Sequence, residues 1–264
     1  MSIDWEPFWI ASGPRRLYAA LHPAPGASSV GIVMAPPLLH ELPRTRRFLT
    51  EIAAELAATG MPCLRFDYHG TGDSSGEGEE LDFSSINTDL TLAASALHER
   101  TGISRLCVLA WRGSALALHG WAGRAHADLI VLWEPVTDGD AWLRQLTEAD
   151  TRERTVRPPS RPGGARVAAA DDGDLMGFPV SARLRTDLAE ARVESARWGR
   201  ARSWAVMRAG IDETPRGLDR ILPLPDNAPA FTIDAAMDAT FFLTPTVREL
   251  VARLGTAVLT DAAA

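Results

Sequence analysis

The stretch LCVLAWRGSALA, residues 106–117, decides the fold. Its first half is a continuous apolar run that predicts a buried strand, Leu106–Ala110, and its second half begins a run of small residues that predicts a helix, Ser114–Gly123. Only three residues separate the two, so the chain turns sharply at Arg112. The same strand-then-helix unit recurs at Val30–Ala35 with Arg44–Thr59, at Cys63–Phe66 with Ser84–Arg100, and at Leu129–Trp133. Repeated units of this kind predict an α/β fold, with a mostly parallel sheet and helices on both faces.

We expect the chain to be organised in three parts: a first part of the core at residues 1–135, a cap insertion at residues 136–200, and a second part of the core at residues 201–264. Around residues 152–174, which are rich in Pro, Gly and Asp, we expect a flexible loop inside the cap. The other expected elements are a hairpin (Phe8–Ser12, Arg15–His22), cap helices (Ala141–Asp150, Val180–Ser195), strands (Trp204–Met207, Phe231–Ile233) and a closing helix (Pro245–Leu254).

Composition and charge limit the classes of partner that this chain is expected to bind. The chain has 264 residues and a net charge of -7 without a basic cluster, which disfavours a nucleic-acid partner. No apolar run reaches membrane-spanning length, and the acidic start is unlike a signal peptide, so we expect a cytoplasmic protein without a membrane partner. Cys63 and Cys107 lie in apolar runs and suggest neither a disulfide nor a metal site. No cofactor is expected, and a homo-oligomer is left open.

The sharp turn at Arg112 resembles the nucleophile elbow of α/β-hydrolases, which predicts that fold with a helical cap. In this alignment Arg112 stands where the catalytic serine belongs, while Ala110 and Ser114 replace the flanking glycines. A shifted frame would make Ser114 the nucleophile, but it would put bulky Arg112 and Leu116 where the elbow needs small residues. The loop Asp67–Gly76 also looks like the Asp-x-x-Gly-x-Gly-x-Ser loop of this superfamily.

Within that superfamily, the chain resembles exosortase-system-associated hydrolase-like proteins, a branch related to serine aminopeptidases that tends to carry Arg at the elbow. The resemblance rests on three segments: Pro36–Arg47, Leu132–Val136 and Gly177–Val180. This chain departs from the group's pattern at His40, Pro43 and Glu134. The chemistry of its pocket therefore need not match that of the group.

The usual catalytic relay is missing. Asp212 matches the acid of the triad, but no histidine follows the last expected strand, and all six histidines lie at or before residue 126. A Ser-His-Asp relay in its usual places is therefore excluded, because the base must reach the proton of the nucleophile.

Other parts of the pocket are still expected. The backbone N–H groups of Gly113 and of Leu38 or Leu39 would form an oxyanion hole, and Trp111 could line it. His40, ahead of His69, is the candidate base at the carboxyl edge of the sheet; Glu134 or Asp212 would orient it.

Arg112 has three interpretations: a clamp for an anionic ligand, an ion-pair partner of Glu41 or Glu134, or a plug in an inactive pocket. The ion pair is favoured, because buried charges are normally paired.

Two classes of function remain ahead of a serine hydrolase that uses Ser114. The first is an acyltransferase or thioesterase-like enzyme of a biosynthetic pathway, acting on a small or carrier-bound acyl group such as an acyl-carrier-protein or CoA thioester. The second is a non-catalytic binding or scaffold protein. The expected oxyanion hole and His40 place the enzyme first.

Overall fold

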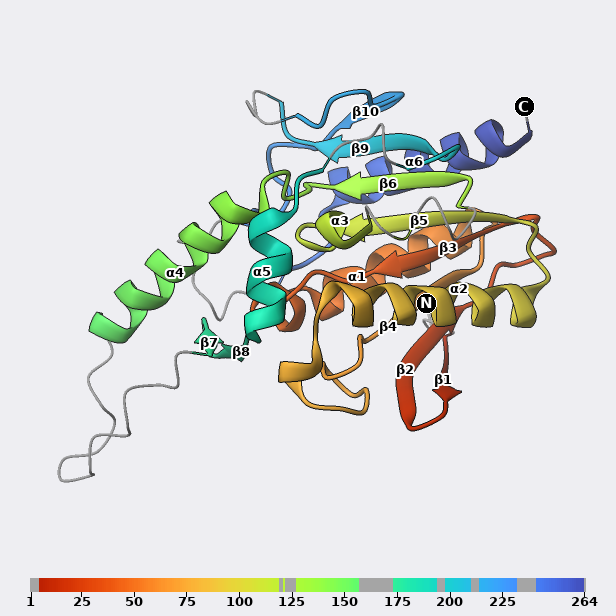
Figure 1. The fold of residues 1–264 in the computed structure, drawn as a ribbon. Helices are drawn as coiled ribbons and strands as arrows, with labels where there is room; N and C mark the ends of the chain where they lie inside the picture. The colour runs from red at the N-terminus through yellow and green to blue at the C-terminus, as the bar shows by residue number, and fades with distance from the viewer. Residues whose placement is uncertain are drawn as a thin grey trace.

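The computed structural model describes residues 5–118, 121, 127–156, 173–193, 198–209, 214–231 and 241–263. Figure 1 shows their arrangement as a sheet with helices packed on it. The strands are β1 (Glu6–Ser12), β2 (Arg15–His22), β3 (Val30–Ala35), β4 (Cys63–Phe66), β5 (Arg105–Trp111), β6 (Leu129–Trp133), β7 (Asp174–Leu175), β8 (Phe178–Pro179), β9 (Arg202–Met207) and β10 (Arg220–Pro223). The helices are α1 (Glu41–Ala58), the 3-10 turn η1 (Gly78–Glu80), α2 (Phe83–Thr101), α3 (Ser114–Ala117), α4 (Gly139–Val156), α5 (Ala182–Glu190) and α6 (Pro245–Ala263).

One eight-stranded sheet organises the chain in the order β1-β2-β4-β3-β5-β6-β9-β10. The strands from β4 to β10 in this order run parallel, and the hairpin β1–β2 adds two antiparallel strands at one edge. This arrangement confirms the predicted mostly parallel sheet. In Figure 1 the arrowheads of β6 and β9 point toward α4 and α5, so those helices lie beyond the carboxyl edge of the sheet.

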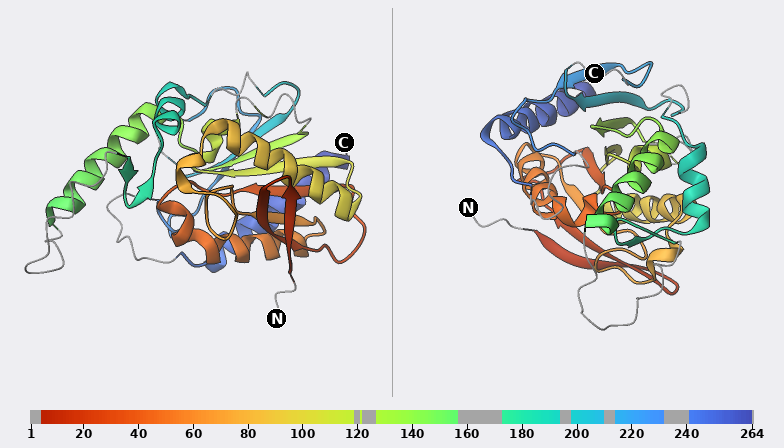
Figure 2. Two further views of the ribbon diagram at one scale, coloured as in Figure 1. Left: turned by 60° about the horizontal axis from the view of Figure 1, so that its bottom comes forward. Right: turned by 90° about the vertical axis from the view of Figure 1, so that its left-hand side faces the viewer.

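Each face of the sheet has its own apolar core. On one face α1 and α6 pack against residues such as Ile32, Leu109 and Val131; on the other α2 and α3 pack against residues such as Val33, Val108 and Ile130, and α4 and α5 continue this second core beyond the carboxyl edge. Figure 2 (right) shows these two helix layers on opposite sides of the strands. Because β3 and β6 are covered on both faces, every residue in them is buried, which explains their unbroken apolar sequences.

The segment between β6 and β9 contributes α4, the small hairpin β7–β8 and α5, none of which joins the eight-stranded sheet. The expectation of a loop from residue 152 is wrong for residues 152–156, because α4 continues to Val156. The ion pair between Arg154 and Asp150, four residues apart, stabilises this last turn, although the sequence has no apolar period there. Residues 157–172 of the expected loop lie outside the described residues, and the boundaries of the three parts stay predictions.

One other expectation needs correction. The last described strand is β10, which pairs parallel with β9, whereas Phe231 lies outside any strand and residues 232–233 lie outside the described residues. β10 has only one neighbour in the sheet and ends at Pro223, so three of its four residues are exposed and its apolar pattern is weak. Among the described helices, none is both long and apolar enough to cross a membrane.

Candidate functional site

Three strained loops meet at the carboxyl edge of the sheet. Leu39, Arg112 and Glu134 follow the neighbouring strands β3, β5 and β6, and each has a left-handed backbone, with φ of 54°, 51° and 40°. This conformation is unfavourable for residues with a Cβ, at about 1–3 kcal/mol each, and it persists only where surrounding contacts hold it. Such strain concentrates at functional sites, so this edge is the candidate site.

Arg112 stands at the apex of the turn. Its N–H donates to the carbonyl oxygen of Trp133 (3.1 Å), and its own carbonyl accepts from the N–H of Val136 (3.2 Å). These backbone hydrogen bonds hold the bend, and they do so independently of the side chain. A strained residue at the apex of a strand-to-helix turn is the geometry of a nucleophile elbow, and the replacement of a serine by Arg112 stays a prediction.

Ser114 occupies a different position, in the first turn of α3, and is fully buried. Its hydroxyl donates to the carbonyl oxygen of Pro36 and accepts from the Tyr68 hydroxyl (3.1 Å). Ser114 thereby ties the elbow to the loop after β3 and to the loop after β4. Neither role presents its oxygen to a substrate.

The Arg112 side chain is held by two acceptors. Its Nε donates to Glu41 Oε1 (3.0 Å) and its Nη1 to the backbone carbonyl of Glu134 (2.8 Å), while the guanidinium lies 5.0 Å from the centre of the Phe231 ring. Of the two predicted carboxylate partners, Glu41 therefore makes the ion pair. Burial raises the pKa of Glu41, and the Arg112 charge opposes that rise.

Glu134 pairs instead with Arg208, a residue that belongs to no motif in the sequence. Arg208 Nε donates to Glu134 Oε1 (2.9 Å), and its Nη2 donates to the carbonyl oxygens of Ala228 (2.8 Å) and Pro229 (3.0 Å). Burial raises the pKa of Glu134, and the charges of Arg208 and Arg112 counteract this. Arg208 directly follows β9, the neighbour of β6, so knowledge of that strand order would have identified it.

His40 lies beside this cluster at the start of α1 and is only 2% exposed. Its Nδ1 has no hydrogen-bond partner in the part of the chain that the structure describes. Burial, helped by the charges of Arg44 and Arg112, lowers its pKa to about 4, so the ring is neutral at neutral pH. The structure thus brings His40, Glu41, Arg112 and Glu134 together; Asp212 lies outside the described residues.

His69 lies in the loop after β4, apart from this cluster. Its Nε2 is 3.3 Å from Glu80 Oε2, its Nδ1 is 3.4 Å from Ser75 Oγ, and its backbone N–H donates to Asp89 (2.8 Å). These contacts brace the loop. Among the described residues, no hydrogen bond or ion pair joins His69 to Arg112 or His40.

The expected oxyanion donors have free N–H groups. Within the described part of the chain, the backbone N–H groups of Leu38, Leu39 and Gly113 make no hydrogen bond. Leu38 and Gly113 are adjacent, because a Cβ added to Gly113 would lie 3.5 Å from Leu38 Cδ1. Buried N–H groups without partners are rare in proteins, so these donors are suited to an incoming acceptor.

Trp142 of α4, which was not among the predicted site residues, covers Gly113. A Cβ on Gly113 would lie 2.8 Å from the Trp142 ring, and the indole is 3% exposed with no partner for its Nε1. Trp111 points elsewhere: it is fully buried in the core, stacked on Trp133 with ring centres 4.5 Å apart. The tryptophan at the candidate site is therefore Trp142, whose only sequence signal was its place on the apolar stripe of a helix.

A mainly apolar cavity of about 290 Å³ shares Leu39 with this site. It lies between the loop after β3, represented by Leu39 and Pro43, the glycine-rich loop around Gly70, and Phe178 of β8. A cavity of this size suits a short acyl chain or a small aromatic group. Among the described residues, no group of three or more His, Cys, Asp or Glu side chains could hold a metal ion.

Comparison with known proteins gives structural likeness without sequence likeness. No family model matches the sequence, and no curated protein matches it. Est1E from Butyrivibrio proteoclasticus, solved with bound ferulic acid, superposes with a TM-score of 0.62 at 13% identity, covering 96% of this chain and 99% of its own.

Two other solved structures give similar results. A putative hydrolase from Agrobacterium vitis S4 has a TM-score of 0.58 at 13% identity, covering 98% of this chain and 100% of its own. The α/β hydrolase GrgF from Penicillium sp. sh18 has a TM-score of 0.53 at 13% identity, covering 77% of this chain and 79% of its own. At such low identity these likenesses establish the α/β-hydrolase fold and no particular activity.

Proposed function

We propose that this chain, which has the α/β-hydrolase fold, transfers an activated acyl group, such as a carrier-protein or CoA thioester, without a serine nucleophile. The observation that carries the proposal is the set of free N–H groups at Gly113, Leu38 and Leu39 beside the strained backbone of Arg112. Donors fixed in this way stabilise the negative charge that develops on a carbonyl oxygen under attack.

In this reaction the acceptor is its own nucleophile. A thiol sulfur attacks the thioester carbonyl carbon, its proton passes to His40, and the departing thiol takes that proton when the original carbon–sulfur bond breaks. The pKa of His40, about 4, makes it a weak base, which favours a thiol acceptor over the far less acidic water. The acyl chain would occupy the cavity beside Leu39 and Phe178.

In the proposed reaction Arg112 positions the loops around the substrate and does not react itself. Its Nε and Nη1 are engaged with Glu41 and the Glu134 carbonyl, so it fixes the loops that carry the oxyanion donors. Its Nη2 makes no hydrogen bond within the described residues and can contact an anionic portion of the substrate. CoA, with its phosphates, fits this better than an acidic carrier protein, since the chain itself has a net charge of -7.

The test is turnover of acyl-CoA and short acyl thioesters, each with and without a thiol acceptor. Replacing a positioned base typically lowers the rate by about 10²–10⁴-fold, so His40→Gln should lose most activity. His98→Gln is the matched control, because His98 lies on α2 with its Nδ1 on the Ile103 carbonyl, outside the site. Trp142→Ala should raise turnover, since the ring covers Gly113. Absence of turnover in both wild type and Trp142→Ala would contradict the proposal.

A second candidate, a non-catalytic acyl-binding or scaffold protein, is favoured by one observation. The Trp142 ring lies against Gly113 while Glu41 neutralises Arg112, so the centre of the site is closed. This candidate predicts saturable binding of a non-hydrolysable acyl thioether of CoA without turnover of the matching thioester. Binding together with turnover would favour the enzyme.

A further inference from the structure

A second site begins with Arg65, a charged residue within strand β4. Side chains alternate between the faces of a strand, and Arg65 shares its face with Cys63, which packs into the core under α1. Its neighbours in the sheet are Met34 on β3 and Ala20 on β2. An arginine therefore occupies a position on a largely apolar face, where a cation normally needs a partner.

Among the described residues no carboxylate contacts Arg65, and Asp67 acts on its charge only from a longer distance. Within the described residues, no Asp or Glu oxygen lies within 4.0 Å of Arg65, whose contacts are a hydrogen bond from Nε to His22 Nε2 (3.0 Å) and the Trp5 ring, 5.8 Å away. Burial and the Arg65 charge lower the pKa of His22 to about 3, so this ring is neutral and brings no compensating charge. The two Nη groups of Arg65 therefore have no acceptor among the residues that the structure describes.

The other two arginines nearby are already paired. Arg46 bonds to Asp67 (3.0 Å) and Asp73 (3.3 Å), and Arg47 bonds to Glu51 (3.0 Å). The carboxylates around this place are thus committed to other cations. Arg65 is the cation that remains open among the residues that line the cavity described next.

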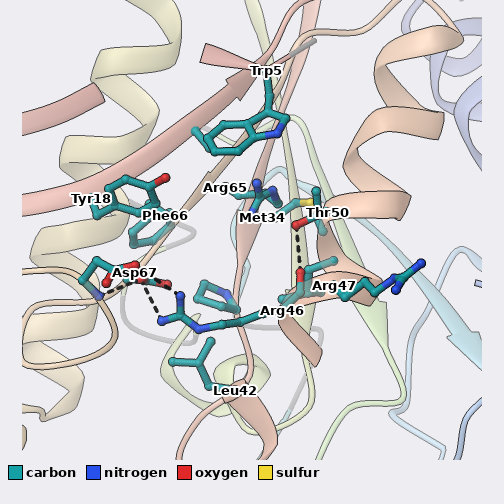
Figure 3. Close-up of a pocket in the computed structure, with 14 residues that line it drawn as sticks. Trp5, Tyr18, Met34, Leu42, Arg46, Arg47, Thr50, Arg65, Phe66 and Asp67 are labelled. Atoms are coloured by element: carbon teal, nitrogen blue, oxygen red, sulfur yellow. Dashed lines mark hydrogen bonds and ion pairs between the residues drawn. The ribbon is translucent and has the colours of Figure 1, made fainter. Parts of the chain in front are cut away.

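That cavity is about 240 Å³ and opens between β2, β4 and α1 (Figure 3). Figure 3 shows the Trp5 indole above the Arg65 guanidinium, with Tyr18 and Phe66 on one side. The Tyr18 hydroxyl has no hydrogen-bond partner among the described residues, and Trp5 is 38% exposed. The cavity therefore combines an open cation, a free hydroxyl and aromatic walls.

We infer that this cavity binds a small organic anion, whose carboxylate or phosphate is held by Arg65 and the Tyr18 hydroxyl and whose planar apolar part lies against Trp5. A guanidinium with free Nη groups binds such anions through two parallel hydrogen bonds, and the ring next to it favours a flat body. The volume is below that of pockets for drug-sized ligands, which limits the ligand to one ring or a short chain. This site is separate from Arg112.

The experiment is a calorimetric titration of the whole chain with phenyl phosphate, benzoate and inorganic phosphate. We expect saturable binding of at least one aryl anion, stronger than that of inorganic phosphate; comparing the two aryl anions identifies the preferred charged group. Arg65→Gln should weaken binding about tenfold or more, as for loss of a hydrogen bond to a charged group, and Tyr18→Phe by a smaller factor. Arg16→Gln is the matched control, since Arg16 is exposed over Trp9 on the same hairpin.

Two further variants locate the binding. Arg112→Gln should leave it unchanged; a loss there would place the anion at the elbow and overturn the inference. Tyr18→Phe removes only a hydroxyl, so it keeps the inference testable should Arg65→Gln fail to fold. Absence of saturation with all three probes, or equal affinity for wild type, Arg65→Gln and Tyr18→Phe, would also overturn it.

Discussion

Arg112 and Arg65 are two largely buried cations near the same sheet, each close to a buried histidine, and they differ in what faces their charge. Arg112, with a side chain 18% exposed, has the carboxylate of Glu41 and the carbonyl of Glu134. Arg65 has a neutral imidazole and an aromatic ring. A cation in contact with its own carboxylate is satisfied by the protein, whereas one without such a contact is available to an added anion.

This difference changes how the elbow is interpreted. An arginine in place of a catalytic serine suggests an anion clamp, yet the Glu41 contact makes Arg112 chiefly part of the scaffold that shapes the loops. The stronger candidate for anion binding lies one strand beyond β3, at a position that no catalytic motif marks. Four predictions test the contrast, from the largest expected effect to the smallest.

The largest effect is expected for Glu41→Ala. It leaves the Arg112 charge largely buried without its carboxylate, and loss of one partner of a buried pair lowers the free energy of unfolding by about 3–5 kcal/mol. Urea unfolding measures this loss. Glu6→Ala is the control, because Glu6 pairs with Arg100 at the surface, where such pairs contribute about 1 kcal/mol or less. Equal losses for the two variants would mean that Glu41 is not a structural partner.

The second prediction concerns the loss of stability in acid that arises from the buried histidines beside the two arginines. The folded-state pKa values of His22, about 3, and His40, about 4, lie below the ordinary 6.5. Below pH 6.5 these two side chains bind protons in the unfolded chain but not in the folded chain. The stability that the neutral rings contribute is therefore fully present above pH 6.5 and is lost as the pH falls toward 4. The loss is about 3 kcal/mol per histidine. The raised pKa values of Glu41 and Glu134 act in the opposite sense.

Comparing variants separates the effect of the histidines on the pH dependence of stability from the effect of these carboxylates. In urea unfolding at pH 7, 6, 5 and about 4, His22→Gln and His40→Gln should each show a flatter decline than the wild type. His98→Gln controls for loss of an imidazole on α2. If both variants decline as steeply as the wild type, the two rings do not stay neutral in the folded protein.

The third prediction concerns Ser114. Ser114→Ala leaves the buried Tyr68 hydroxyl and the Pro36 carbonyl without this partner, at a loss of about 1–3 kcal/mol in unfolding free energy. The exposed contact of Ser104 makes Ser104→Ala a control with little loss. We further expect a fluorophosphonate probe, read by mass spectrometry, to leave Ser114 unlabelled. Labelling would restore the serine-hydrolase interpretation.

The smallest effect is expected for Arg65→Met without ligand. No carboxylate is left behind, and an apolar side chain of similar length fits this face of β4, so stability should change by less than about 1 kcal/mol. An aryl anion should then raise the melting temperature of the wild type and not that of Arg65→Met. A loss as large as that of Glu41→Ala would erase the contrast between the two arginines.

The fold was predictable wherever burial imposes an unbroken apolar sequence. β3, β5 and β6 are covered on both faces, so their sequences identify them as strands. β10 was missed because it pairs on one side only and keeps a weak pattern, and the end of α4 was missed because ion pairs rather than apolar spacing stabilise it.

The site was predictable only as far as single loops determine it. The apex position of Arg112 follows from local spacing, and Glu41 was one of two foreseen partners. Three contacts could not be predicted, because they depend on which elements become neighbours in the fold and no local pattern indicates that. They are those of Arg208 with Glu134, of Trp142 with Gly113 and of Arg65 with His22. The role of Asp212 stays a prediction.

The hydrogen bonds that bend the elbow come from Trp133 and Val136 and do not involve the guanidinium of Arg112. The backbone bend at residue 112 is thus independent of the side chain that stands there. For protein engineering, residue 112 is therefore a position at which the side chain can be varied while the hydrogen bonds that hold the bend are kept.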